Sequence, residues 1–184
     1  EMQTLEIGKG EVIQDGTDIA IFAYGHTVDW AQTVADKFEK EGVSVAVINA
    51  RFAKPVDKEL IVRYALKARC LVTTEEHSLK GGFGSAILEA LQEEQMVHVP
   101  VKCIGLGDIV LEHGAVGDQR RDLKLDPEGM FETIMTFYGA VAEMAASGKG
   151  KARMIGKEAA TTEMPSYSGN GNEAKIKVEQ SLNG

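Results

Sequence analysis

Residues 19–48, IAIFAYGHTVDWAQTVADKFEKEGVSVAVI, hold two apolar runs on either side of an amphipathic stretch. The first run, 19–24 (IAIFAY), is short and continuously apolar, which predicts a buried strand. The second, 43–48 (VSVAVI), is rich in β-branched residues and predicts another strand. Two strands joined by a helix pair in parallel through a right-handed crossover. This unit decides the fold class.

The amphipathic stretch between the two runs predicts a helix. Its large apolar side chains recur at intervals of four residues, so they share one helix face: Trp30, Val34 and Phe38. Thr27 is the expected N-cap, and Gly42 is placed where a helix ends.

The same alternation continues along the chain. Helices are expected from Pro55 and Asp57, after Gly84, and from Asp126-Pro127, where proline is tolerated in the first turn. Further strands are expected at 70–74 (CLVTT) and 99–104 (VPVKCI), with an edge strand within 5–15 and an irregular stretch at 105–117. Repeated units of this kind predict an α/β fold with three layers, α/β/α, around a mostly parallel sheet of about five strands.

Length and composition also suggest a division of the 184-residue chain. We expect a lead-in with an edge strand at 1–16, the α/β domain at 17–146 and a flexible or docking tail at 147–184. The tail is rich in Gly, Ser, Lys and Asn and has only isolated apolar residues, although Ile176 and Val178 alternate with charged residues as in an edge strand. Its function is not evident from the sequence.

Charge and composition exclude several classes of function. The chain has 20 Lys and Arg against 28 Asp and Glu, a net charge of −8, which argues against binding to nucleic acid or an anionic membrane. No apolar run approaches the roughly 20 residues of a membrane span, and no signal-peptide pattern is present. Cys70 and Cys103 are expected to be reduced, and the four histidines show no metal-ligand spacing. The expectation is a cytoplasmic protein.

The glycine-rich turn Gly81–Gly84 (GGFG) is the first candidate site. At the start of a helix, the amides of Gly82, Phe83 and Gly84 are able to face an anion. The turn lacks the Lys-Ser/Thr of a P-loop, however, and Ile87 stands where the dinucleotide fingerprint requires glycine. A tight turn with close backbone packing is the favoured interpretation.

Charged residues follow the ends of several expected strands. Glu75, Glu76 and His77 follow one strand, where paired carboxylates are able to carry acid–base chemistry. The favoured alternative is that one glutamate caps a helix or pairs with Arg51, Lys54 or another subunit. Arg51 and Lys54 follow another strand, and either bind a phosphate or carboxylate or belong to a solvated face or an interface salt bridge. His113 is expected at a cap or an interface.

Several of these segments together resemble the C-terminal domain of the 1-deoxy-D-xylulose-5-phosphate synthases, thiamine-diphosphate enzymes of the transketolase superfamily. The specific motifs, in this order, are NARFAKPVD at 49–57, TTEEHSLKGGFGSAILEAL at 73–91, EHG at 112–114 and LDPEGMFETI at 125–134. The resemblance covers about residues 5–146. It departs at Gly107, where relatives commonly have proline, and no Arg-Phe follows Asp108.

The resemblance implies a transketolase C-terminal-like domain that supports a homodimer and the assembly of the active site. The complete enzymes condense pyruvate with glyceraldehyde 3-phosphate, releasing carbon dioxide, in isoprenoid precursor synthesis. Thiamine diphosphate and Mg²⁺ are implied for the complete enzyme, on N-terminal and middle domains that are expected partners of this chain. No catalytic, cofactor-binding or metal-binding residue is therefore assigned here. The interface or anion-contact candidates are Arg51, Lys54, Glu76, His77, Gly82, Phe83, Gly84 and His113.

Three alternatives stay open. The chain is either an excised fragment or one subunit of a split enzyme. The domain could instead belong to a transketolase or to the β subunit of a 2-oxo-acid dehydrogenase. Finally, it could be a regulatory module that senses an anion at Gly82–Gly84 with Arg51 and Lys54.

Overall fold

The computed structural model describes residues 4–147. Along the chain the elements are β1 (Glu11–Gln14), β2 (Ile19–Ala23), α1 (Thr27–Lys40), β3 (Val45–Asn49), α2 (Lys58–Lys67), β4 (Cys70–Ser78), α3 (Phe83–Glu93), β5 (Val101–Leu106), α4 (Val116–Asp122) and α5 (Pro127–Ala146). The strands and helices expected from the alternating pattern are therefore largely confirmed, and α4 is an additional element.

The five strands form one sheet in the order β1-β3-β2-β4-β5. β2 pairs in parallel with β3 and with β4, and β4 pairs in parallel with β5, whereas β1 runs antiparallel to β3. The expected mostly parallel sheet of five strands is confirmed. Because β2, β3, β4 and β5 all run the same way, their carboxyl ends meet at one edge of the sheet.

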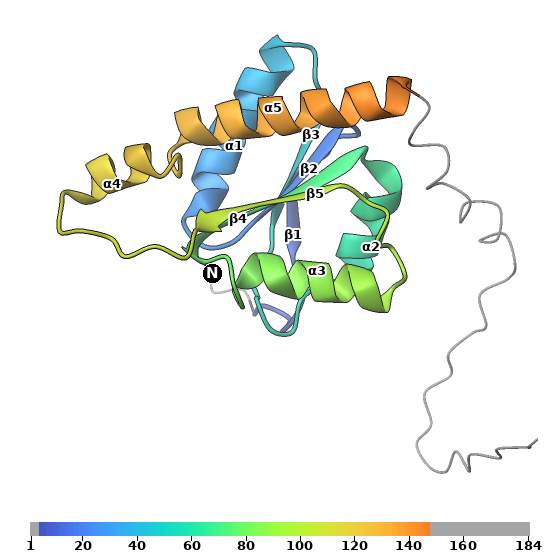
Figure 1. The fold of residues 1–184 in the computed structure, drawn as a ribbon. Helices are drawn as coiled ribbons and strands as arrows, with labels where there is room; N and C mark the ends of the chain where they lie inside the picture. Colours follow the sequence, from blue (N-terminus) through green and yellow to red (C-terminus); the bar gives the residue numbers. More distant parts are fainter. Residues whose placement is uncertain (1–3, 148–184) are drawn as a thin grey trace, which may run out of the picture. The chain divides into compact units, whose positions relative to one another are not determined.

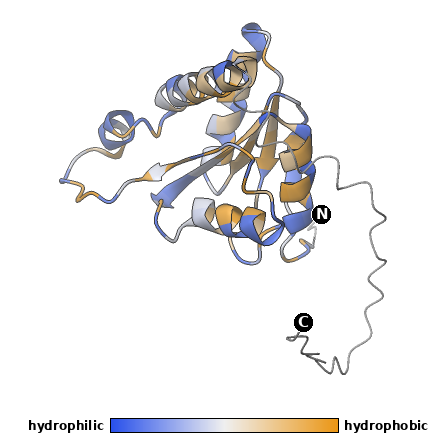
Figure 2. Cartoon of the chain, turned by 45° about the vertical axis from the view of Figure 1, so that its right-hand side comes forward, coloured by the Kyte–Doolittle hydropathy of each residue, from blue (hydrophilic) through white to orange (hydrophobic). Residues whose placement is uncertain are grey.

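Helices cover both faces of this sheet (Figure 1). On one face, α1 and α5 bury a cluster that includes Ile21, Phe38 and Ile134. On the other face, α2 and α3 bury a second cluster that includes Phe22, Tyr64 and Ile87. Figure 2 shows the middle of the sheet coloured as hydrophobic, between helices that carry both hydrophobic and hydrophilic colouring. This arrangement is the expected three-layer α/β/α fold.

Two of the expected helix starts are confirmed by their caps. The Asp57 carboxylate accepts a hydrogen bond from the Leu60 amide at the start of α2, at 3.1 Å. The Asp126 carboxylate accepts one from the Gly129 amide at the start of α5, at 2.9 Å, with Pro127 as the first helical residue. Each cap pairs an amide that the helix itself leaves free.

The expected N-cap of α1 is wrong. His26 occupies that position and makes no side-chain cap bond. Thr27 is instead buried, and its hydroxyl oxygen lies 3.0 Å from the carbonyl oxygen of Thr74 and 2.8 Å from the Thr74 hydroxyl. The hydroxyl thus joins the first turn of α1 to β4, a long-range contact that local sequence rules do not predict.

The expected α/β domain ends at residue 146, which is also the last residue of α5. The expected flexible or docking tail, 147–184, falls almost wholly outside the described residues, so it stays a prediction. Within residues 4–147, no helix is both long enough and apolar enough to cross a membrane.

Candidate functional site

The edge where the parallel strands end carries most of the candidate residues. Tyr24 to Thr27 follow β2, residues 50–54 follow β3, the end of β4 leads to the glycine-rich turn, and residues 107–115 follow β5. In open α/β sheets, ligands and partners usually bind at this edge. It is therefore the natural place to look for function.

Glu75 is the most buried ionisable residue at this edge, with 1% of its surface exposed. One carboxylate oxygen accepts a hydrogen bond from the Phe83 amide at 2.7 Å, and the other accepts one from the Gly84 amide at 2.8 Å. Of the two adjacent glutamates, Glu75 thus caps a helix, as the favoured sequence interpretation anticipated. A carboxylate at a helix N-terminus is also stabilised by the helix dipole.

The glycine-rich turn allows the Glu75 carboxylate to approach the start of α3 closely. A Cβ atom on Gly82 would overlap the Ser78 carbonyl oxygen and the Glu75 carboxylate, and one on Gly84 would lie 2.7 Å from the Thr73 hydroxyl. Phe83 is buried and stacks on Tyr24 with ring centroids 5.3 Å apart. The Phe83 and Gly84 amides are paired with Glu75 and so are not free for an external anion.

Glu76 belongs to a second cluster at the same edge. Its carboxylate forms an ion pair with Arg120 of α4, with an N–O distance of 2.7 Å. The Arg120 guanidinium also lies over the Trp30 ring, 4.9 Å from its centroid, and His26 packs edge-on against the same ring. Arg120 therefore attaches α4 to both α1 and β4. Sequence reasoning missed Arg120 because 44 residues separate it from Glu76.

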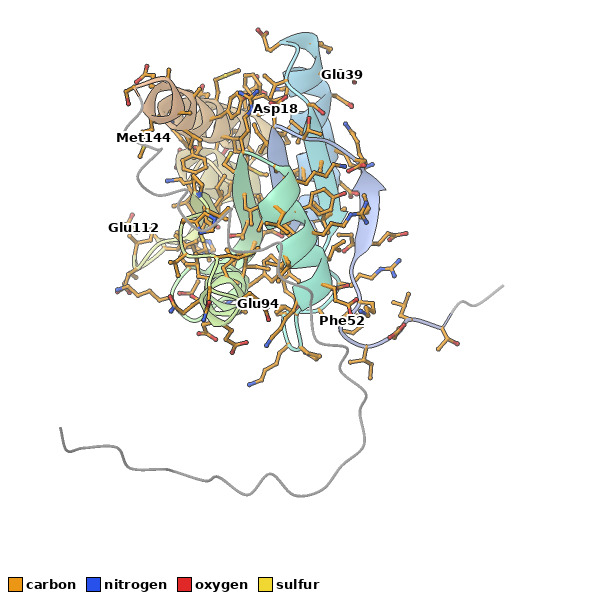
Figure 3. All side chains as sticks on the ribbon, turned by 90° about the vertical axis from the view of Figure 1, so that its right-hand side faces the viewer. Asp18, Glu39, Phe52, Glu94, Glu112 and Met144 are labelled. Carbon is orange, nitrogen blue, oxygen red and sulfur yellow. The ribbon has the colours of Figure 1, made fainter. Side chains whose placement is uncertain are left out.

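Within residues 4–147, no hydrogen bond or ion pair joins Arg51 or Lys54 to that cluster. The Arg51 guanidinium pairs with Glu11 of β1 at 2.6 Å, and the Arg51 backbone is left-handed, with φ of 57°. Lys54 is exposed in the turn after β3, near Phe52, which Figure 3 labels. His77 is also exposed, at the end of β4.

The segment from 107 to 122, here called the arm, exposes apolar side chains at the end of β5. Val110 is 94% exposed, and Ile109, Leu111 and Val116 are also largely exposed. α4 buries none of its residues, and His113 and Glu112 lie on the exposed arm (Figures 1 and 3). The apolar run GDIVLEHG, outside any expected strand or helix, was the available sequence signal for this surface.

The described residues do not form a cofactor or metal site. No group of three or more His, Cys, Asp and Glu side chains within residues 4–147 is placed to hold a metal ion. The N-terminus of α3, at the glycine-rich turn, already holds the Glu75 carboxylate. The residues present therefore do not fit thiamine diphosphate with Mg²⁺, and no chemical step is assigned to them.

The fold and this edge define a class of domain: a mostly parallel, three-layer α/β domain with exposed apolar and charged side chains at its strand ends. The chain belongs to the family of transketolase C-terminal domains, whose family model matches residues 8–130.

Comparison with curated relatives shows which enzymes of this family the chain resembles. The chain is 50% identical over 137 residues to the 1-deoxy-D-xylulose-5-phosphate synthase of Thermosynechococcus vestitus, covering 74% of this chain and 21% of that protein. It is 49% identical over 125 residues to the synthase of Heliobacterium modesticaldum, covering 68% of this chain and 19% of the relative. The chain thus spans about a fifth of the length of these relatives.

A solved structure described as a split-gene transketolase, an inactive β4 tetramer, has the same fold. It superposes with a TM-score of 0.66 at 32% identity, covering 73% of this chain and 43% of that one.

Proposed function

We propose that this chain is the C-terminal domain of a 1-deoxy-D-xylulose-5-phosphate synthase. The complete enzyme would condense pyruvate with glyceraldehyde 3-phosphate and release carbon dioxide, in the isoprenoid precursor pathway. The observation that carries the proposal is the identity of 50% and 49% with two synthases over most of the α/β domain. The lower identity of 32% to the transketolase structure makes a transketolase the second candidate.

The anion-sensing alternative has less support. It requires free amides at Gly82–Gly84, but Glu75 occupies the Phe83 and Gly84 amides. It also requires Arg51 as an anion ligand, whereas the Arg51 guanidinium is paired with Glu11.

Within this proposal the domain contributes assembly rather than chemistry. Thiamine diphosphate and Mg²⁺ would bind on other domains of the complete enzyme, where thiamine diphosphate supplies the carbanion chemistry. A rigid α/β domain helps by fixing the cleft in which the substrates are held together and water is excluded. The chain alone is then inactive, and the assembled enzyme is a cytoplasmic homodimer.

The proposed contact surface is the strand-end edge with the arm. Exposed apolar side chains in a cluster are typical of protein interfaces, and Ile109, Val110 and Leu111 form such a cluster. Glu76, His77 and His113 would add polar contacts around it, and Arg51 and Lys54 would extend it past β3. The buried Phe83 and the close-packed Gly82 and Gly84 would act by shaping the edge.

Reconstitution tests this function. The chain is mixed with the N-terminal and middle domains of the Thermosynechococcus relative, with thiamine diphosphate, Mg²⁺, pyruvate and glyceraldehyde 3-phosphate. We expect a stable complex that forms deoxyxylulose 5-phosphate, and no product from either part alone. Product from the chain alone, or a complex active only with transketolase substrates, would overturn the proposal.

A further inference from the structure

β5 is an edge strand whose outer side is open in the described part of the chain. It stands at the end of the strand order and, among the described strands, pairs with β4 alone. The carbonyl oxygens of Pro100 and Leu106 accept hydrogen bonds from an amide of β4 and from the amide that follows this strand. Because the backbone groups of successive strand residues point to alternate sides, the N–H and C=O groups of Val101, Cys103 and Gly105 point away from β4. Another strand is able to pair with them.

This edge lacks the features that usually protect an exposed strand. Natural edge strands are kept from pairing by charged side chains, proline or very short length. β5 has six residues, no proline and a single charged residue, Lys102. It therefore offers a template to a further strand.

A groove of about 740 Å³ lies along α5 beside this edge. Lys102 of β5 and Lys124 line it together with α5 residues, which are Phe131, Glu132, Thr133, Met135, Thr136, Phe137 and Ala140. Several of the α5 residues follow the three- and four-residue spacing of one helix face, and its apolar members are only partly buried. The groove thus places partly exposed apolar surface next to a free strand edge.

We propose that this edge binds a second copy of the same chain, with the two β5 strands antiparallel about a two-fold axis. An axis perpendicular to the sheet keeps both α5 helices on the same side of the joined sheet, so the two grooves face each other. The outward groups of Val101, Cys103 and Gly105 then pair with those of the copy. The inference names the surface for the homodimer of the proposed function and rests on that proposal only in this respect.

The charges along the groove favour a copy in this orientation. Figure 1 shows β5 and α5 running in opposite directions, so Lys102, the second residue of β5, and Glu132, among the first groove residues of α5, lie toward opposite ends of the groove. Within residues 4–147 Lys102 forms no ion pair, and the Glu132 side chain is 62% exposed although it pairs with Lys124. The two-fold axis exchanges the two ends, so each Lys102 meets the Glu132 of the copy.

The strand pairing itself is self-complementary, as a two-fold contact requires. Antiparallel strands place residues of the same face opposite each other. With Cys103 on the axis, Lys102 lies opposite Ile104 of the copy. With Ile104 on the axis, it lies opposite Leu106 of the copy. Neither register brings like charges together, and both place apolar residues in the centre of the interface.

Self-association of the full chain tests this inference. Sedimentation is measured between about 1 and about 100 µM, with hydrogen exchange of the β5 amides at the same concentrations. We expect dimers at the higher concentrations, where the amides of Val101, Cys103 and Gly105 should exchange at least about tenfold more slowly than on dilution. A monomer throughout the range would overturn the inference. Protection of β5 that is unchanged on dilution would also overturn it, because the occupant would then belong to the same molecule.

Two alanines of α5 provide a matched pair of variants. Both are exposed, but Ala140 lines the groove and Ala142 does not. Ala140→Glu should raise the dissociation constant of the dimer at least about tenfold, whereas Ala142→Glu should leave it unchanged. Equal dissociation constants for the two variants would show that the copies do not meet along this groove.

Charge reversal tests the orientation of the two copies. Lys102→Glu should weaken the dimer, and adding Glu132→Lys should restore it, because the reversed pair forms across the axis. A double variant as weak as Lys102→Glu alone would contradict the antiparallel arrangement. No substrate and no other domain enters these measurements, so their failure would leave the proposed activity untouched.

Discussion

One carboxylate oxygen of Glu75 lies 2.7 Å from the backbone nitrogen of Phe83, and this hydrogen bond ties the end of β4 to the start of α3. The second oxygen accepts from the next amide, that of Gly84, and the whole side chain is buried. Glu75→Ala leaves both amides without a partner in a buried place. We expect the free energy of unfolding to fall by about 2–4 kcal/mol, measured by urea denaturation.

The matched control for that loss is Glu89→Ala, on the exposed side of α3. It should change the unfolding free energy by less than about 0.5 kcal/mol. Equal effects of the two substitutions would show that the Glu75 contacts contribute little.

Gly81 and Gly82 should respond differently to alanine. Gly81 has a φ of +74° but open space around its Cβ position, so Gly81→Ala should cost about 1 kcal/mol of backbone strain. At Gly82 the new methyl group would overlap the Ser78 carbonyl and Glu75, so the loss of stability should be clearly larger. Thermal unfolding of both variants checks the order, and a reversed order would contradict the close packing described here.

The Asp15 carboxylate should make stability depend on pH in acid. Its pKa is lowered from 3.8 to about 2 by hydrogen bonds from Lys67 first and then from Tyr64. Because this pKa is lower in the folded than in the unfolded state, the stabilisation that Asp15 gives is complete above the pKa of the unfolded state. It is lost as the pH falls through about 2. The stability difference between the chain and Asp15→Asn should therefore shrink over that range.

Urea midpoints at low salt, taken from about pH 5 down to about pH 2, measure this difference. The exposed Asp36 serves as the control, because Asp36→Asn removes a carboxylate outside this contact. A difference for Asp15→Asn that stays constant with pH would contradict the pairing.

Arg120 should control how firmly α4 is held. Arg120→Gln removes the ion pair with Glu76 and the contact with the Trp30 ring. Both contacts are partly exposed, so the global unfolding free energy should change by only about 1 kcal/mol. Hydrogen exchange of 116–122 should nevertheless become faster. Arg121→Gln, whose ion-pair partner Asp118 lies within α4 itself, is the control and should have a smaller effect.

Substitutions on the arm should weaken assembly in the reconstituted enzyme. Val110→Asp places a charge on the most exposed apolar residue, and we expect the affinity for the other domains to fall at least about tenfold. Leu66→Asp, an exposed position on α2 away from the arm, should leave it unchanged (Figure 1). Equal affinities for both variants would exclude the arm from the interface.

Glu76→Ala and His77→Ala test the polar part of the same surface. In the reconstituted enzyme, both should weaken assembly more than they alter discrimination between substrates. Sedimentation and steady-state kinetics with competing aldehydes separate the two effects. Normal assembly with altered discrimination would place these residues nearer the substrates than the proposal does.

The sheet and its helices could be predicted from the sequence because buried residues recur along the chain with the spacing of a strand or a helix. The continuous apolar runs around Ile21 and Val47 are buried strands, and the spacing of Val34 and Phe38 is that of a helix face. α4 was missed because it buries none of its residues, so no apolar period marks it. β4 extends to Ser78 rather than Thr74, through Glu75, whose burial depends on amides at the start of α3, and then through three exposed polar residues that carry no apolar pattern.

The position of the candidate site in the fold could be predicted from the sequence, but the ion-pair partners of its residues could not. Following the strand ends located Arg51, Glu76 and His77 at one edge. The partners of these side chains depend on the tertiary fold: Arg51 pairs with Glu11, and Glu76 pairs with Arg120. Contacts between residues 40 or 44 positions apart leave no local pattern in a single sequence.

The strand order has a consequence for how the chain folds. Among the described strands, none pairs with its neighbour through a hairpin: β2 and β3 are separated by α1, and β1 pairs with β3 past β2. Two strands can therefore pair only after the chain between them has been brought into place. Closing that long connection costs conformational entropy before the hydrogen bonds of the pair are formed. The smallest unit able to bury both a strand and a helix face is β2-α1-β3. A domain of this topology is expected to fold more slowly than a helical bundle of its size, with strand edges exposed to aggregation meanwhile.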